Sequence, residues 1–133
     1  MNYIKKLAKR ILAKDYDIIE KDNIDNCVMF LNDTGLYMVK NRRYKYFLYF
    51  ILTNAKLRCK RNDYKCKVLV GHLEMLAEKF GIKHTTFKLY LYKMITDKIL
   101  IDYEQFTFGN QAYTFNPEYF DTYLLTDYKT LEE

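Results

Sequence analysis

The side chains of this sequence best suited to metal or nucleophilic chemistry are its cysteines and histidines. Cys59, Cys66, His72 and His84 follow one another with six, five and eleven intervening residues. Small zinc sites use closely paired ligands, roughly two to four residues apart, so this spacing predicts no metal site. A Cys59–Cys66 disulfide would close the basic segment between them. The odd number of cysteines favours thiols instead.

Carboxylates offer a second kind of chemistry. Asp102 and Glu104 stand two residues apart, which places them on one face of a strand, where they could hold Mg²⁺. A solvated strand face is the more common role for such a pair. The sequence contains no glycine-rich phosphate loop and neither the HExxH nor the GxSxG motif. We therefore expect no enzyme and no cofactor.

Charge is distributed unevenly along the chain. There are 22 Lys and Arg against 17 Asp and Glu, which gives a net charge of +5. Residues 1–14 and 40–67 carry most of the excess, whereas residues 99–133 are acidic. A basic surface commonly meets a polyanion, either a nucleic acid or a membrane surface. The basic candidates for phosphate contacts in the middle segment are Arg42, Arg43, Arg58, Lys60 and Arg61.

Length and hydropathy limit the class of protein. A chain of 133 residues fits one domain, and 4 Gly with 1 Pro favours helices with one or two hairpins. The longest apolar run, residues 46–52, is far shorter than the ~20 residues of a membrane helix. Residues 2–14 lack the features of a signal peptide. We expect a cytoplasmic protein that does not enter a membrane.

Apolar periodicity predicts the elements. An amphipathic basic helix is expected over 1–14 and a hairpin over 27–39, with its turn at 32–35. Gly81 should end one helix and Thr85 or Thr86 should cap the next. The remaining expected elements are a buried helix over 43–57, a short strand over 66–70, helices over 73–80 and 84–98, strands over 100–108 and 112–115, and a short helix within 118–133.

Two stretches carry a family resemblance. Residues 73–82 read LEMLAEKFGI, with Ala77 small enough for close helix packing, and residues 97–101 read DKILI. In this order and spacing they resemble the winged-helix-turn-helix family, over about residues 44–120. The resemblance implies an α+β fold, a winged helix-turn-helix domain at 43–133. Residues 1–42 would then add an N-terminal helix and a β-hairpin extension.

The same resemblance makes residues 84–98 a recognition helix for the DNA major groove. Its outer side, opposite Phe87 and Leu91, would bind nucleic acid. Thr, Tyr and Lys suit phosphates, and Leu89 could touch a thymine methyl group. Leu89 and Tyr92 could equally pack against another element, such as the 1–14 helix, or a partner. The candidate contacts on this helix are His84, Thr85, Thr86, Lys88, Leu89, Tyr92 and Lys93.

The expected wing departs from the family pattern. Its first strand carries Asp102 and Glu104, and its tip at 109–111 has no Lys or Arg. Phosphate contacts would have to come from the basic residues of 42–45 and 58–61 instead. The helix also lacks Arg, Asn and Gln on its outer side, so sequence specificity should be modest.

The leading hypothesis is a small double-stranded DNA-binding protein, a transcriptional regulator of a mobile element or virus. A homodimer is expected, because the apolar stripe of residues 4–12 and the ring-rich segment 44–52 offer more apolar surface than one small core needs. One alternative is a single-stranded DNA-binding accessory protein of replication or recombination, since 14 Tyr and 9 Phe could stack on bases. The other is a winged helix used for protein–protein contact.

Overall fold

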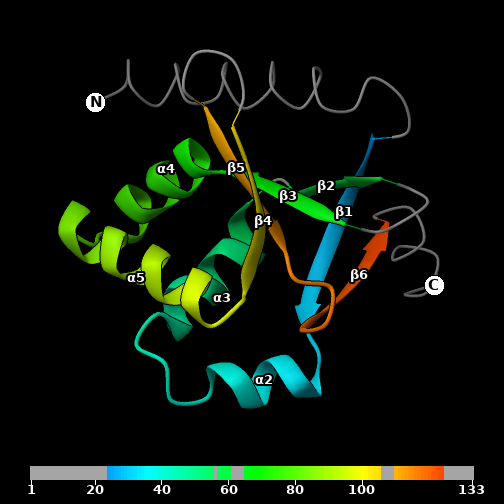
Figure 1. Ribbon diagram of the computed structural model, residues 1–133, viewed down its shortest axis with the longest axis horizontal. Helices are drawn as coiled ribbons and strands as arrows, with labels where there is room; N and C mark the ends of the chain where they lie inside the picture. The colour runs from blue at the N-terminus through cyan, green and yellow to red at the C-terminus, as the bar shows by residue number, and fades with distance from the viewer. Residues whose placement is uncertain (1–23, 56, 61–64, 106–109, 125–133) are drawn as a thin grey trace.

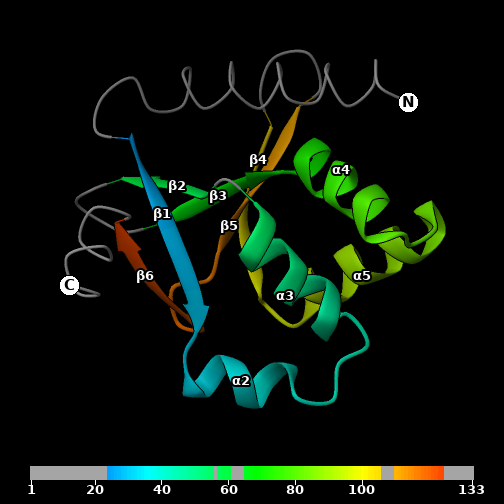
Figure 2. The ribbon, with the colours of Figure 1, turned by 180° about the vertical axis from the view of Figure 1, so that it is seen from behind.

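The computed structural model describes residues 24–55, 57–60, 65–105 and 110–124, and it is a mixed α+β structure. Three helices gather beside one half of an antiparallel sheet, and a fourth lies below the other half (Figures 1 and 2). The elements are β1 (Ile24–Leu31), α2 (Asp33–Val39), α3 (Lys45–Asn54), β2 (Leu57–Lys60), β3 (Cys66–Leu69), α4 (Val70–Phe80), α5 (His84–Thr96), β4 (Leu100–Gln105), β5 (Gln111–Phe115) and β6 (Phe120–Leu124).

All six described strands belong to one sheet, in the order β4-β5-β3-β2-β1-β6. The strands β4, β5 and β3 stand next to the three helices α3, α4 and α5 (Figure 1). The other half is built around β1, which pairs with β2 on one side and with β6 on the other. The first and last described strands, β1 and β6, thus share one sheet with the central strands.

The helix α3 is the centre of the core, as its nearly continuous apolar sequence predicts. Phe47, Leu48 and Ile51 are buried. The Phe47 ring lies 5.6 Å from the Phe80 ring of α4 and 6.2 Å from the Phe87 ring of α5, centroid to centroid. One aromatic side chain therefore joins all three helices, and edge and tilted contacts of this kind add to the energy of burial.

The turn between α4 and α5 is also as predicted. Gly81 ends α4 with a φ of 93°, a left-handed conformation that favours glycine, and its N–H donates to the Ala77 carbonyl at 3.0 Å. The start of α5 is different from the prediction. Its N-cap is Lys83, with no side-chain cap, so Thr85 and Thr86 lie inside the first turn and the predicted hydroxyl cap is wrong.

The predicted hairpin at 27–39 is wrong in its second half, which is the helix α2. The Asn32 side chain caps this helix by accepting a hydrogen bond from the Gly35 N–H at 2.8 Å. Gly35 itself packs against the Tyr119 carbonyl, where a Cβ would clash. Residues 32–35, which are typical of a tight turn, thus serve two other purposes. Asn32 caps α2, and Gly35 lets the helix approach the backbone at Tyr119.

The predicted C-terminal helix is also wrong over 120–124, which form the strand β6 beside β1. Asn116 shapes the preceding turn: its side-chain amide donates to the Lys98 carbonyl at 2.9 Å, and its side-chain oxygen accepts from the Glu118 N–H at 3.0 Å. The turn buries Tyr119 and Phe120 against the core. The helix predicted over 1–14, and residues 125–133, lie outside the described residues.

Two cysteines are defined in the structure. Cys27 is disulfide-bonded, whereas Cys66 keeps a buried thiol. A Cys59–Cys66 bridge is therefore absent, and Cys27 is an exception to the predicted preference for thiols. Separately, no helix within the described ranges is long and apolar enough to cross a membrane.

Candidate nucleic-acid interface

The helix α5 has one face in the core and one in solvent. Phe87 and Met94 are fully buried, and Leu91 and Ile95 pack against the same cluster. The opposite face follows the 3.6-residue period and points away from the core. Its exposed residues are His84, Thr85, Lys88, Leu89, Tyr92, Lys93 and Thr96, while Thr86 is half-buried. The structure thus brings the predicted helix contacts together on one surface, which we call the α5 face.

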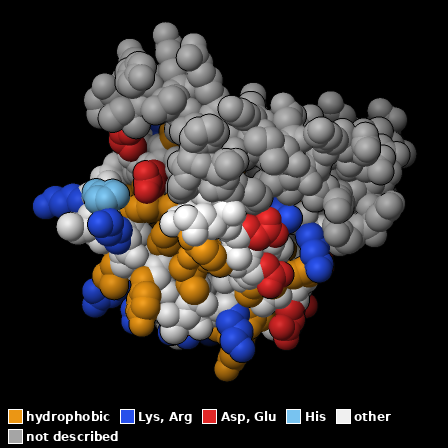
Figure 3. Space-filling model, turned by 45° about the horizontal axis from the view of Figure 1, so that its top comes forward, with side chains coloured by type: hydrophobic (Ala, Val, Ile, Leu, Met, Phe, Trp, Pro, Cys, Tyr) orange, Lys and Arg blue, Asp and Glu red, His pale blue; other side chains and the backbone are white. Residues whose placement is uncertain are grey.

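The α5 face carries no negative side chain. Residues 84–96 contain no Asp or Glu, and Lys88 and Lys93 are both exposed. Two more exposed lysines stand at the N-terminal end, Lys79 at the end of α4 and Lys83 in the turn. Figure 3 shows Lys and Arg side chains and a histidine on the helical side of the molecule, with acidic side chains beside them. The positive end of the helix dipole adds to the attraction for an anion at this end.

Asp97, the first acid after α5, is paired with a hydrogen-bond donor and a cation of the same fold. The Tyr44 hydroxyl donates to Asp97 Oδ2 at 2.7 Å, and Arg42 Nε lies 3.2 Å from the same oxygen. Burial, with the hydrogen bond to Asp97, raises the pKa of the Tyr44 hydroxyl above its usual value. Asp97 therefore contributes little negative charge to the end of the α5 face, and it fastens α5 to the segment before α3.

This contact changes how the predicted basic residues of the middle segment are used. Arg42, a predicted phosphate contact, forms an ion pair with Asp97, which partly offsets its positive charge. Its side chain is still 48% exposed. Arg43 is exposed beside it, and exposed Lys98 follows Asp97. Cations therefore stand at the C-terminal end of the α5 face as well. The Tyr44–Asp97 contact was not predicted, because nothing in the sequence pairs two residues 53 positions apart.

The second predicted basic group, at residues 58–61, lies partly in a strand. Arg58 and Lys60 lie in the strand β2, where Arg58 stands opposite Asn26 of β1 and Lys67 of β3. This strand lies across the sheet from α5 (Figure 1). The side chains of Arg58 and Lys60, and all of Arg61, lie outside the described part. The structure therefore does not join this group to the α5 face.

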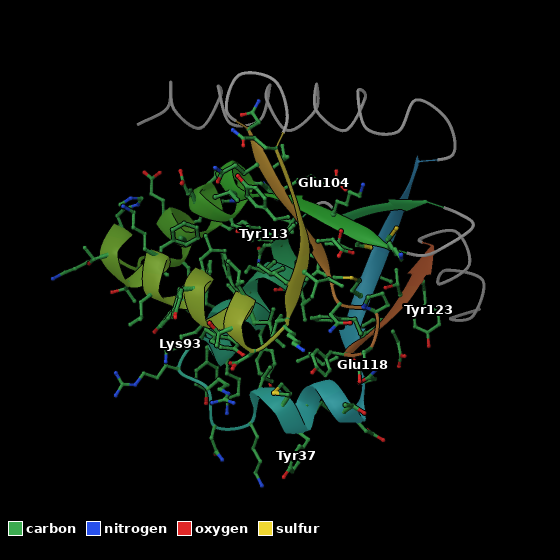
Figure 4. All side chains as sticks on the ribbon, in the orientation of Figure 1. Tyr37, Lys93, Glu104, Tyr113, Glu118 and Tyr123 are labelled. Carbon is green, nitrogen blue, oxygen red and sulfur yellow. The ribbon has the colours of Figure 1, made fainter. Side chains whose placement is uncertain are left out.

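The hairpin of β4 and β5 is acidic where it is described. Residues 100–115 contain Asp102 and Glu104 but no Lys or Arg. Glu104 accepts from Lys67 Nζ at 3.0 Å, so the nearest strand cation is paired (Figure 4 labels Glu104). A bulge between Ile101 and Glu104 puts Asp102 at a φ of 51°, and the two carboxylates no longer share a regular strand face.

Metal and acid–base chemistry find little support at the described residues. No group of three or more His, Cys, Asp or Glu that could hold a metal occurs among them. His72 is only 5% exposed, and neither of its ring nitrogens has a hydrogen-bond partner in the described part of the chain. Burial, with a smaller effect from Lys79, lowers the pKa of His72 to about 4. This histidine is thus a neutral packing residue at pH 7.

The chain has no match among protein-family models, curated proteins or solved structures. The geometry of the α5 face and of the hairpin beside it is therefore what supports a function.

Proposed function

We propose that this protein is a winged helix-turn-helix protein that binds double-stranded DNA with α5 in the major groove. The order α3, β2, β3, α4, α5, β4, β5 suits that family apart from the additional strand β2, because β5 lies between β3 and β4 in the sheet and the three helices pack beside them. A small transcriptional regulator of a mobile element or virus, modest in specificity, is the role we favour.

One observation carries this proposal: the α5 face is free of acids and has cations at both ends. A helix of 13 residues is about 20 Å long, and the major groove is about 12 Å wide. A helix placed across the groove would therefore bring its two ends to the two rows of phosphates. The exposed cations available there are Lys79, Lys83, Lys88, Lys93, Lys98 and Arg43.

The test is a titration of a labelled duplex and of its separate single strand at ~50 mM and ~200 mM salt. If six cations meet phosphates, duplex affinity should fall about a thousandfold between these concentrations, because each contact releases counterions. The Lys88→Ala/Lys93→Ala variant should bind more weakly and lower the salt slope by about 2. The control is Lys65→Ala, an exposed lysine that directly precedes β3, at the end of this strand opposite to α4. Absence of binding at ~50 mM salt would refute the proposal.

Contact with another protein is the second candidate function, and a specific feature favours it. Phe30 of β1 and Tyr123 of the edge strand β6 are both exposed, with ring centroids 6.3 Å apart. An exposed ring pair beside a sheet edge suits a protein partner. The acidic hairpin is compatible with this role. Retention of the predicted homodimer without DNA binding would favour this candidate.

Single-stranded DNA binding has weaker support. A strand of bases needs a continuous row of rings to stack on. Among the described residues, the exposed tyrosines instead belong to five different elements, and two of those labelled in Figure 4, Tyr37 and Tyr123, lie well apart. These residues are Tyr37 of α2, Tyr46 of α3, Tyr92 of α5, Tyr103 of β4 and Tyr123 of β6. Tighter binding of the single strand than of the duplex would reverse this ranking.

The proposal also includes a homodimer, but the apolar surface that would form its interface differs from the predicted one. Most of the 44–52 segment is used by the core, where Tyr44, Phe47, Leu48 and Ile51 are buried. The stripe at 4–12 lies outside the described residues. Exposed Phe30 and Tyr123 now provide the apolar surface on which a second copy could pack. Light scattering at high micromolar concentration should give twice the mass of 16.2 kDa.

A further inference from the structure

We propose that the α5 face reads thymine through its C5 methyl group, using the exposed apolar surface of Leu89 and Tyr92. This inference rests on the proposed function and names the class of DNA site that the helix would select. The expected sites are duplexes with thymine at the positions facing the middle of α5.

The observation behind this proposal is an apolar centre on an otherwise polar face. Leu89 is 46% exposed and Tyr92 is 64% exposed. They are three residues apart on one helix, so their side chains are neighbours on its surface. Neither belongs to the core cluster or packs against it. Hydrophobic and basic side chains lie together on the helical side of Figure 3.

The side-chain types that α5 lacks limit which DNA bases this helix could recognise. Guanine is read mainly by Arg or Lys, adenine by Asn or Gln, and cytosine by Asp or Glu. The sequence of α5, HTTFKLYLYKMIT, contains none of these except two lysines. Thymine is the one standard base that presents an apolar group in the major groove. Leu89 and Tyr92 therefore match thymine, while Lys88 and Lys93 beside them suit phosphates.

A third side chain extends this apolar surface. The Thr96 hydroxyl donates to the Tyr92 carbonyl at 2.9 Å, one turn earlier on α5. Its hydrogen is thus used within the helix, so the hydroxyl cannot donate to a base at the same time. What Thr96 offers as a new contact is its methyl group and the remaining acceptor capacity of its oxygen.

The test compares duplexes that differ only in the methyl group. An AT-rich duplex is prepared with thymine and again with uracil, which pairs identically but lacks the C5 methyl. The uracil duplex should bind about fourfold more weakly for each methyl group contacted, as the burial energy of one methyl group predicts. A GC-rich duplex should gain affinity when its cytosines carry a C5 methyl, because that group occupies the same place in the groove.

Substitutions test whether the preference for thymine over uracil comes from the α5 face. Leu89→Ala and Tyr92→Ala should reduce the thymine-to-uracil ratio of affinities toward one, because each variant removes apolar surface that would contact the methyl group. Matched controls come from α2, where Leu36 is also 46% exposed and Tyr37 is 82% exposed. Leu36→Ala and Tyr37→Ala should keep the wild-type ratio. Circular dichroism checks that every variant is folded.

The outcomes separate this inference from the proposed function. Salt-dependent binding with equal affinity for thymine and uracil duplexes would overturn thymine reading and leave DNA binding in place. Equal weakening of both duplexes by Leu89→Ala would also overturn it. No binding to any duplex would overturn the proposed function, and Leu89 and Tyr92 would then be surface for another protein.

Discussion

The α5 face and the β4–β5 hairpin are neighbours in the fold but opposite in charge. The α5 face carries cations and no acid, whereas the hairpin carries Asp102 and Glu104 and no cation. A winged domain that grips DNA with both elements needs positive charge on both. The difference indicates that binding, in our proposal, depends on α5 and the cations at its two ends, with the hairpin serving mainly to complete the sheet. The predictions below test this division, beginning with the largest expected effect.

The largest effect should come from the buried side of α5. Phe87 is 2% exposed and contacts the Phe47 ring, so Phe87→Ala should lower the free energy of unfolding by about 3–5 kcal/mol. Leu89→Ala on the exposed side should change it by less than ~0.5 kcal/mol. Urea unfolding at pH 7 measures both. Similar losses for the two variants would mean that Leu89 packs against the fold.

Acid should have the next largest effect, through His72 in α4. Its pKa is about 4 in the folded protein and about 6.5 in the unfolded chain, so the unfolded chain binds the proton more tightly. The stability from this group is complete above pH ~6.5 and is lost as the pH falls toward 4. At pH 4.5 the loss should be about 2–3 kcal/mol.

The control for this prediction removes the titrating group. His72→Leu fills a similar volume and leaves no unpaired ring nitrogen, so the difference in unfolding free energy between wild type and variant should grow in favour of the variant as the pH falls. A constant difference from pH 7 to pH 4.5 would contradict the shifted pKa. Comparisons of the α5 face with the hairpin therefore belong at pH 7, where His72 is neutral.

The elements that the sequence predicts well are those whose signals are local. The helices α3, α4 and α5 have apolar residues at helical spacing, and Gly81 marks the turn. The exposed side of α5 follows from the same spacing. No distant partner is needed to place these residues.

The features that could not be predicted depend on distant contacts. Asn32 reads as a turn residue, yet its side-chain amide donates to the Glu118 carbonyl, 86 residues away, while its oxygen caps α2. The strand β6 forms because β1 offers it an edge. From the sequence, Arg42 is expected to be an unpaired cation, whereas in the structure it pairs with Asp97. In each case the local pattern is compatible with two structures, and tertiary packing selects one.

A smaller effect is expected where α5 is fastened to the segment before α3. Tyr44→Phe removes one hydrogen bond to Asp97 and keeps the ring, so the free energy of unfolding should fall by about 1–2 kcal/mol. Because the pKa of Tyr44 is raised by folding, the stability from this hydroxyl is complete below pH ~10 and is lost as the pH rises further. Tyr44→Phe should lose less stability than wild type between pH 9 and pH 11. An equal loss would show that another group titrates there.

The smallest effect should separate the hairpin from the α5 face. Asp102 is exposed at a φ of 51°, a conformation that Asn adopts as readily, so Asp102→Asn removes one charge with little change in structure. If the hairpin lies within a Debye length of the phosphates, about 10 Å at 0.1 M salt, duplex affinity should rise about twofold at low salt and hardly at all at high salt.

Asp121→Asn on β6 is the matched control, since this exposed acid lies across the sheet from α5. A twofold rise for Asp102→Asn alone would place the hairpin beside the DNA as a repulsive element. No change for either variant would mean that the hairpin points away from it and that the α5 face binds unaided.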